Sequence, residues 1–306
     1  MVLAPMADVT DAAFRRVIAK YGRPDVTWTE FVSADGLCHA NGRARLLKDL
    51  TYSAAERPIV AQLFTSHPEK LEQAAALALS LGFDGVDINM GCPDRSIEKQ
   101  GAGAALIKTP ALARELIKAA KRGVQNQIPV SVKTRLGYNK DELETWLPEL
   151  LAEAPAVVTL HARTRKEMSK VPARWERVAR AVEIRNEQGS ETLIFGNGDA
   201  KDLAHARELA AASGADGVML GRAIFGNPWL FAEHQPTTEE KLTVMLEHTK
   251  LFEALLGDVK SFAIMKKHYK AYVAGFDGAH ELRAKLMETA NASEVEQLVA
   301  RYLSTR

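Results

Sequence analysis

The chain has 306 residues, of which 46% are hydrophobic and 26% charged, a composition typical of a globular protein with a large core. The formal net charge of +1 neither indicates nor excludes a nucleic-acid partner, because a local basic patch can suffice. Two cysteines without CxxC spacing argue against a disulfide framework or a zinc site. No apolar run approaches the roughly 18 residues of a membrane span, so we expect a cytoplasmic protein without membrane contact.

Short apolar runs rich in β-branched residues recur along the first 235 residues, and helical patterns separate most of them. This alternation predicts parallel βαβ units, and eight such units predict a TIM (β/α)8 barrel of the α/β class. A doubly wound open sheet is the structural alternative. The predicted strands are residues 2–6, 29–33, 59–64, 85–91, 130–135, 157–162, 192–196 and 217–221.

The clearest predicted helices of the barrel are residues 10–21 and 67–81, and Thr109-Pro110 begins another. The interval 34–58 is the least clear, and we expect a loop plus a short helix there. Near residue 236 the pattern changes, because no strand-like run follows. We expect a barrel domain over residues 1–235 and a small helical domain over 236–306, with helices at 241–256, 260–273, 281–290 and 293–302.

In a TIM barrel the active site lies where the strands run into the loops that follow them. Two glycine loops follow the last two predicted strands, Gly196-Asn197-Gly198-Asp199 and Gly221-Arg222-Ala223. Glycine lets backbone amides approach an anion closely, and Arg222 could add a charge-assisted hydrogen bond. These loops predict a phosphate site, which fits FMN but also a phosphorylated substrate. Ordinary turn chemistry is the alternative.

Gln62 and Lys133, both near strand ends, favour a flavin over a phosphosugar. The pyrimidine edge of a flavin needs hydrogen bonds, and a cation near its N1 stabilises the reduced, anionic form. Lys133 could instead form an ion pair at the barrel mouth. His161 could contact the flavin, take part in catalysis, or be a hydrogen-bonded histidine of the rim.

Cys92 stands between Gly91 and Pro93 directly after a predicted strand, so its thiol lies on a constrained loop beside the barrel mouth. A thiol with a pKa of about 8.5 is mostly protonated at neutral pH and can serve as a general acid. Without a resolving cysteine, disulfide redox chemistry is disfavoured. Cys38 is interpreted as an inert core residue.

At these residues the chain resembles the dihydrouridine synthases over essentially its whole length. The central segment Val86-Asp87-Ile88-Asn89-Met90-Gly91-Cys92-Pro93 matches the family signature. So do Ala4-Pro5-Met6-Ala7, Gln62-Leu63-Phe64, Lys133-Thr134-Arg135, His161-Ala162-Arg163-Thr164, Gly196-Asn197-Gly198-Asp199 and Gly217-Val218-Met219-Leu220-Gly221-Arg222-Ala223.

The resemblance implies that FMN delivers a hydride from N5 to C6 of a uracil in RNA, while Cys92 protonates C5. NADPH would be the transient reductant, since no Gly-x-Gly-x-x-Gly fingerprint follows a strand; NADH remains open. Asn89 would contact the uracil, with Arg163 a weaker candidate. FMN would be held by Pro5, Met6, Ala7, Gln62, Lys133, His161, Asn197, Gly198, Asp199, Gly221 and Arg222.

The resemblance also implies a helical RNA-binding domain. Between residues 260 and 285 six basic side chains stand against two acidic ones, interleaved with Tyr269, Tyr272 and Phe276. We expect RNA contacts from this patch through phosphate neutralisation. The residues we expect to bind RNA are Lys266, Lys267, Lys270 and Arg283.

Two departures from the family pattern concern the substrate loops: Asp8 stands where many members have glycine, and residues 168–172 lack the usual glycine and aromatic residue. Transfer RNA is the expected substrate, with ribosomal RNA, a free pyrimidine or an enone as alternatives. Outside the family, a non-catalytic RNA-binding protein or a phosphosugar lyase or isomerase remains open. A monomer is expected.

Overall fold

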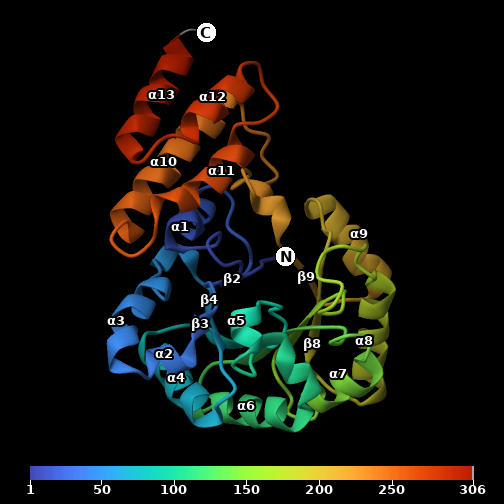
Figure 1. Cartoon of the computed structure of the whole chain (residues 1–306). Coiled ribbons are helices and arrows are strands. Elements are labelled where there is room, and N and C mark those ends of the chain that lie inside the picture. The colour runs from blue at the N-terminus through green and yellow to red at the C-terminus, as the bar shows by residue number, and fades with distance from the viewer. Residues whose placement is uncertain (305–306) are drawn as a thin grey trace.

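The computed structural model describes residues 1–304, and its strands form a nearly closed parallel barrel ringed by helices (Figure 1). Neighbouring strands follow the order β1-β9-β8-β7-β6-β5-β4-β2, and β3 also pairs with β4. Between β1 and β2, Leu3 N–H donates to Val26 O at 3.4 Å and Asp25 N–H donates to Met1 O at 3.1 Å. The predicted TIM barrel is therefore confirmed. Its strands are β1 (Val2–Leu3), β2 (Thr27–Trp28), β3 (Val32–Ser33), β4 (Ile59–Phe64), β5 (Gly85–Asn89), β6 (Val130–Arg135), β7 (Val157–His161), β8 (Leu193–Asn197) and β9 (Gly217–Leu220).

The second strand position of the barrel is split into β2 and β3. The prediction of one continuous strand over residues 29–33 is wrong in this respect. β2 and β3 both pair with β4, and residues 29–31 between them leave the strand conformation. The Thr29 hydroxyl accepts the Gln62 N–H at 3.1 Å and donates to Glu30 O at 2.8 Å. The Thr29 hydroxyl thus takes the place of a backbone carbonyl as the partner of the Gln62 N–H. The pattern of apolar residues does not predict such a replacement.

Helices cover the outside of the barrel. Asp11 caps the first of them by accepting the Phe14 N–H at 2.9 Å, and Pro110 occupies the first turn of another, as predicted. Residues 34–58 hold more helix than predicted, because two helices and a 3-10 turn (Ala54–Glu56) fill that interval. The helices of this part are α1 (Ala12–Tyr21), α2 (Ala34–Leu37), α3 (Ala40–Asp49), α4 (Pro68–Ser80), α5 (Arg95–Glu98), α6 (Pro110–Gly123), α7 (Leu143–Leu151), α8 (Trp175–Glu187) and α9 (Leu203–Ser213).

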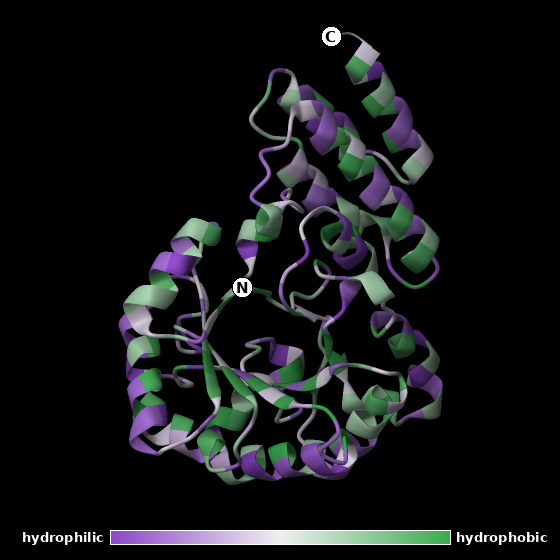
Figure 2. Cartoon of the chain, turned by 180° about the vertical axis from the view of Figure 1, so that it is seen from behind, coloured by the Kyte–Doolittle hydropathy of each residue, from purple (hydrophilic) through white to green (hydrophobic). Residues whose placement is uncertain are grey.

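Two apolar layers stabilise the barrel. The outward-facing strand residues pack against the apolar faces of the helices, whose polar faces point away from the barrel (Figure 2). Inside the barrel a smaller cluster consists of Val2, Ala4, Trp28, Val60 and Met219. Toward the carboxyl ends of the strands the inward-facing residues are polar, which is the composition expected of a binding site there.

The chain after residue 235 is helical, as predicted. The region consists of α10 (Thr238–Leu256), α11 (Met265–Tyr272), α12 (Ala279–Leu286) and α13 (Ala292–Ser304), with a 3-10 turn (Phe262–Ile264) before α11. Thr237 and Glu240 form a capping box at the start of α10.

This helical region packs against α1 of the barrel (Figure 1). The ring of Phe14 in α1 stacks on His248 in α10, with centroids 4.7 Å apart. One apolar cluster includes residues of α1, β9 and all four C-terminal helices, so the core is continuous across residue 235. The division into two domains stays a prediction. No helix of residues 1–304 is long and apolar enough to cross a membrane.

Candidate active site

A cavity of about 800 Å³ lies at the carboxyl ends of the barrel strands, a size typical of small-molecule and cofactor sites. The predicted site residues of the barrel line it, except Ala7, which is exposed at the first loop. Those lining residues are Pro5, Met6, Gln62, Asn89, Cys92, Lys133, His161, Arg163, Asn197, Gly198, Asp199, Gly221 and Arg222.

Strand register explains why these side chains meet. Asn89 of β5 pairs with Lys133 of β6, and His161 of β7 pairs with Asn197 of β8. Side chains along a strand point alternately to its two faces, so every second residue faces the barrel interior. The strand ends therefore supply an inward ring of polar groups.

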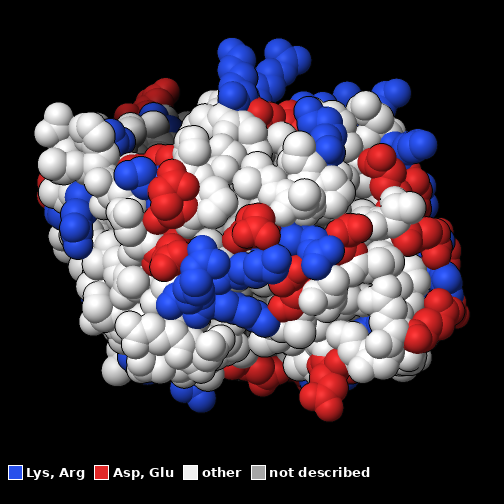
Figure 3. All heavy atoms as spheres, turned by 90° about the horizontal axis from the view of Figure 1, so that it is seen from below, with Lys and Arg blue, Asp and Glu red and all other residues white. Residues whose placement is uncertain are grey.

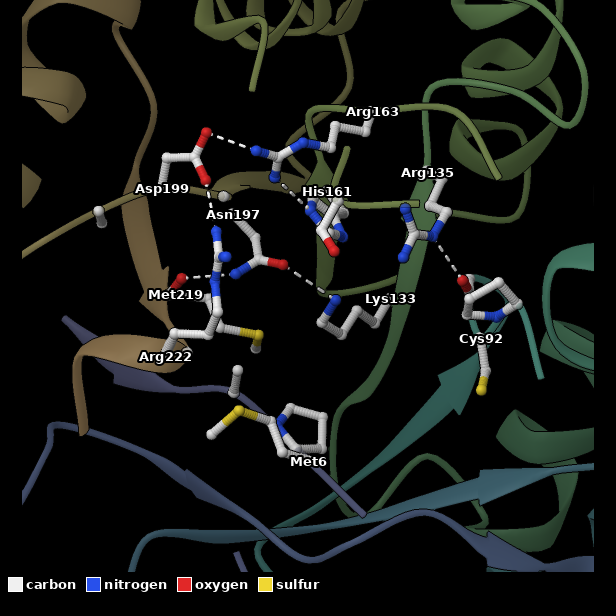
Figure 4. Close-up of a pocket in the computed structure, with 18 of the residues that line it drawn as sticks. Met6, Cys92, Lys133, Arg135, His161, Arg163, Asn197, Asp199, Met219 and Arg222 are labelled. Atoms are coloured by element: carbon white, nitrogen blue, oxygen red, sulfur yellow. Dashed lines mark hydrogen bonds and ion pairs between the residues drawn. The ribbon is translucent and has the colours of Figure 1, made fainter. Parts of the chain in front are cut away.

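Lys133 lies near the middle of this ring and points toward Asn197 (Figure 4). Its Nζ donates to Asn197 Oδ1 at 3.1 Å, and Asn197 Nδ2 donates to Met219 O at 2.7 Å. Burial, with the nearby charge of Arg135, lowers the pKa of Lys133 to about 8. Within residues 1–304 no carboxylate forms an ion pair with this ammonium, which leaves it available for an anionic group in the cavity.

The two glycine loops present free backbone amides. Gly198 has a φ of 127° and Asp199 a φ of 56°, so the chain turns sharply after β8. After β9, Ile224 N–H closes a 3-10 turn onto Gly221 O at 3.1 Å. Across the described chain, no protein group accepts the N–H groups of Gly198, Asp199, Arg222 and Ala223.

The fit of a phosphate to these loops can be judged at Gly221. A Cβ there would lie 3.7 Å from Ala4 Cβ and Met6 Sδ, an ordinary contact, so protein packing does not require glycine. Space and free amides remain on the cavity side. The donor set suits a phosphate group, as the sequence predicts.

Asp199 joins two arginines at the cavity rim. Its carboxylate accepts from Arg163 Nη2 at 2.5 Å and from Arg222 Nη2 at 2.7 Å, and the Arg163 hydrogen bond lowers the pKa of Asp199. Arg222 is 68% exposed, whereas Arg163 is almost fully buried. Arg163 also donates to Val171 O at 2.6 Å and to His161 Nε2 at 3.1 Å. Its contacts are thus with protein groups, and its predicted contact with substrate stays a prediction.

His161 is a neutral ring at the cavity wall. Burial, followed by the charges of Arg135 and Lys133, lowers its pKa well below the usual value. Since the Arg163 guanidinium can only donate, His161 Nε2 accepts and the ring proton is assigned to Nδ1. A neutral His161 can donate one hydrogen bond into the cavity without adding charge.

Cys92 lies across the cavity from Asp199 and Arg222 (Figure 4). Asn89 Oδ1 accepts the N–H groups of Gly91 and Cys92 at 3.2 and 2.9 Å, and Arg135 Nε donates to Gly91 O at 2.7 Å. Burial raises the pKa of the Cys92 thiol, so it is protonated at neutral pH and can donate a proton. Cys38, by contrast, lies outside the cavity, with its Sγ 3.6 Å from Lys70 O.

The sequence-based selection missed several lining residues. Arg135 stands at the end of β6, so the rule that found Lys133 would also have found it, whereas Phe31 lies in the break between β2 and β3. Met168 and Ser169 belong to a long loop after β7 and carry no such signal. Lys201 follows the loop after β8 and also lines the cavity.

The predicted RNA patch is only partly at the surface. Lys267 and Lys270 are exposed on α11 and Lys266 is half-buried. Arg283 donates to Val273 O at 3.0 Å, at the end of α11. Tyr269 and Tyr272, which interleave with these charges in the sequence, are fully buried in the core. The period of α11 puts them on its inner face.

The surface of the barrel that faces away from the C-terminal helices carries charges of both signs. Figure 3 shows Lys and Arg side chains beside Asp and Glu on that face. Arg114 of α6 pairs with Glu149 and Glu153, and Arg122 pairs with Glu72 of α4. These basic side chains are therefore compensated by carboxylates beside them.

Comparison with known proteins relates the chain to one family. The family model described as dihydrouridine synthase matches residues 2–305. A probable tRNA-dihydrouridine synthase of Staphylococcus aureus (strain COL) is 42% identical over 303 residues, covering 97% of this chain and 91% of the relative. A probable tRNA-dihydrouridine synthase 2 of Bacillus subtilis (strain 168) is also 42% identical, covering 97% of this chain and 92% of the relative.

Solved structures show the fold alone. Histamine dehydrogenase from Rhizobium sp. 4-9 superposes with a TM-score of 0.54 at 12% identity, over 82% of this chain and 48% of the other. A 2-naphthoyl-CoA reductase superposes with a TM-score of 0.52 at 13% identity, over 76% of this chain and 47% of the other. This chain therefore spans about half the length of those proteins.

Proposed function

The chain belongs to the dihydrouridine synthase family, and on that premise we propose that it reduces uridine to 5,6-dihydrouridine in transfer RNA, with FMN as cofactor and NADPH as reductant. One arrangement carries the proposal. Free amides after β8 and β9, the unpaired ammonium of Lys133 and the protonated thiol of Cys92 face a single cavity.

The residues of the cavity suit FMN in three places. The amides of Gly198, Asp199, Arg222 and Ala223 would hold the phosphate, with the Arg222 guanidinium beside them. Lys133 and Gln62 would bind the pyrimidine edge of the ring, where a cation favours the reduced form. Pro5, Met6 and the neutral His161 would pack against the remaining edges.

When bound, FMN supplies the hydride for C6 of the uracil. The chain's own part is to hold the base at the cavity mouth and to provide a proton. Cys92 would donate the proton from Sγ to C5, because its raised pKa keeps the thiol protonated at neutral pH. Asn89, whose side chain lines the cavity beside Cys92, would contact the uracil edge.

Transfer RNA is favoured over ribosomal RNA by the names of both relatives. The exposed Lys267 and Lys270 on α11 would neutralise phosphates of the bound RNA. The uridine must leave its stack to reach the cavity, which costs a few kcal/mol that RNA contacts must offset. We further propose that the enzyme works in the cytoplasm as a monomer.

The test is product analysis with matched RNAs. Purified protein, FMN and NADPH are incubated with an unmodified tRNA transcript, a ribosomal RNA fragment or free uridine. Nucleosides are then examined by mass spectrometry for addition of two hydrogen atoms. Dihydrouridine from the tRNA transcript alone supports the proposal. Product from the ribosomal fragment or from free uridine, with none from tRNA, would overturn the assignment of substrate.

A further inference from the structure

Asp87 lies inside the barrel below the active-site cavity, where it is 1% exposed, and the proposed reaction gives it no role. Register places it between Gln62 of β4 and Ser131 of β6. Ser131 Oγ donates to Asp87 Oδ1 at 2.5 Å, and Gln62 Nε2 donates to Asp87 Oδ2 at 2.6 Å. The carboxylate is thus a pure acceptor for two neighbouring side chains.

A chain of hydrogen bonds leads from Asp87 to the Cys92 turn. Gln62 Oε1 accepts from Asn89 Nδ2 at 3.2 Å. Asn89 Oδ1 then accepts the N–H groups of Gly91 and Cys92. Each link is buried or nearly so, so water does not substitute for a lost partner without a cost.

The donor-to-acceptor direction of this hydrogen-bond chain is fixed at both of its ends. Backbone N–H groups can only donate, so Asn89 must turn its oxygen toward Cys92 and its nitrogen toward Gln62. Gln62 must then present its oxygen to Asn89 and its nitrogen to Asp87. An acceptor at position 87 is the one group that completes the chain in this direction.

We propose that Asp87 is a positioning residue for the Cys92 thiol, acting through the side-chain amides of Gln62 and Asn89. Its oxygen holds the Gln62 amide in one orientation, Gln62 holds Asn89, and Asn89 holds the turn that carries Cys92. The role of the thiol as proton donor rests on the proposed function, whereas the positioning is a property of the folded chain.

The protonation state of the Asp87 carboxyl agrees with its role as a hydrogen-bond acceptor. Burial raises the pKa of Asp87 to about 6, and the hydrogen bonds from Gln62 and Ser131 oppose that rise. The carboxyl is therefore mostly ionised at neutral pH and offers both oxygens. An asparagine could still offer one oxygen to Gln62 while its nitrogen donates to the Ser131 hydroxyl.

The test measures how Cys92 reacts, independently of catalysis. In the holoenzyme carrying Cys38→Ala, Cys92 is the remaining thiol, and its alkylation by iodoacetamide is followed between pH 7 and 10. Asp87→Val removes the acceptor, and Asp87→Asn keeps one. Ser131→Ala is the matched control, because it removes a hydrogen bond to the same carboxylate outside the chain to Cys92.

We expect alkylation in Asp87→Val to be faster by about fivefold, the size expected when one buried hydrogen bond of the turn is unmade. Asp87→Asn and Ser131→Ala should stay within about twofold of the parent. A parental rate in Asp87→Val, or an equal increase in Ser131→Ala, would overturn the proposal. Should Asp87→Val not fold, Gln62→Met breaks the same chain one step later, and a parental rate there would overturn it as well.

The two proposals fail in different ways. A parent enzyme that forms no dihydrouridine would overturn the proposed function while the alkylation rates still report on the turn. An active parent with no effect of Asp87→Val would overturn only the positioning role.

Discussion

The ammonium of Lys260 lies 2.6 Å from Glu30 Oε2 and joins the helical region to the mouth of the barrel. Asp49 Oδ1 lies 3.3 Å from the same ammonium. Glu30 also accepts the Asp8 N–H at 2.5 Å, and Asp8 has a φ of 54°. Asp8, a departure from the family pattern, therefore belongs to a loop that is held by an ion pair across the two parts of the chain.

Replacing Lys260 by methionine should destabilise the protein by about 3 kcal/mol, because Glu30 would stay buried without its cation. The measurement is urea unfolding. Lys250→Met is the matched control, since Lys250 pairs with Glu296 at a half-exposed site and should contribute less than about 1 kcal/mol. Equal losses in the two variants would show that the Lys260 pair is an ordinary surface contact.

Cys92→Ala should bind FMN normally and form dihydrouridine about 10²- to 10⁴-fold more slowly, the range associated with loss of a general acid. Flavin absorbance checks binding, and single-turnover product formation checks the rate. Cys38→Ala, the matched control outside the cavity, should keep the parental rate. Undiminished product formation in Cys92→Ala would refute its role as proton donor.

Lys267→Gln combined with Lys270→Gln should weaken tRNA binding and flatten its dependence on salt. If each lysine neutralises one phosphate, the slope of log affinity against log salt falls by about 2 in magnitude. Lys118→Gln with Arg122→Gln removes the same charge from α6, where both residues are ion-paired, and should leave the slope unchanged. The same slope in both double variants would exclude the α11 patch.

His268 predicts a specific loss of stability in acid. Neither ring nitrogen of His268 has a hydrogen-bond partner among residues 1–304, and burial lowers its pKa from 6.5 to about 3. Because the folded pKa is depressed, the unfolded chain takes up the proton first. Stability from this group is complete above pH 6.5 and falls by about 1.4 kcal/mol per pH unit below it, until the folded pKa is reached.

His268→Phe should therefore lose about 2 kcal/mol less stability than the parent between pH 7.5 and 5.0, as measured by urea unfolding. Asp11, whose pKa burial raises to about 6, acts in the opposite direction in both proteins and cancels in the difference. Exposed His280→Gln is the control and should follow the parent. Identical pH dependence in His268→Phe and the parent would contradict a neutral, buried His268.

The barrel could be predicted from the sequence because its strands are short apolar runs at a steady rhythm, and burial on both faces produces that pattern. The break between β2 and β3 could not be predicted, since it depends on the Thr29 hydroxyl meeting the Gln62 amide from a strand far along the chain. In residues 34–58 one short helix was predicted, and the structure has two helices there. α3 has no fully buried residue, so its apolar period is weak.

Local motifs predicted that Cys92 and the glycine loops lie at the cavity, while the roles of these residues stay predictions. Hydrogen bonds between side chains from different strands and loops could not be predicted from the sequence. Arg163 stands two residues after His161, yet its three side-chain nitrogens donate to Val171, His161 and Asp199. Asp87 shows the same limit, because its partners come from the two neighbouring strands.

The most direct test of the central claim is flavin reoxidation under anaerobic conditions. The enzyme is reduced with one equivalent of NADPH and mixed with unmodified tRNA transcript or with buffer, and flavin absorbance is followed. We predict that absorbance returns only with tRNA, and that dihydrouridine forms in step with it. Reoxidation at the same rate without RNA, or with RNA but without dihydrouridine, would contradict the account.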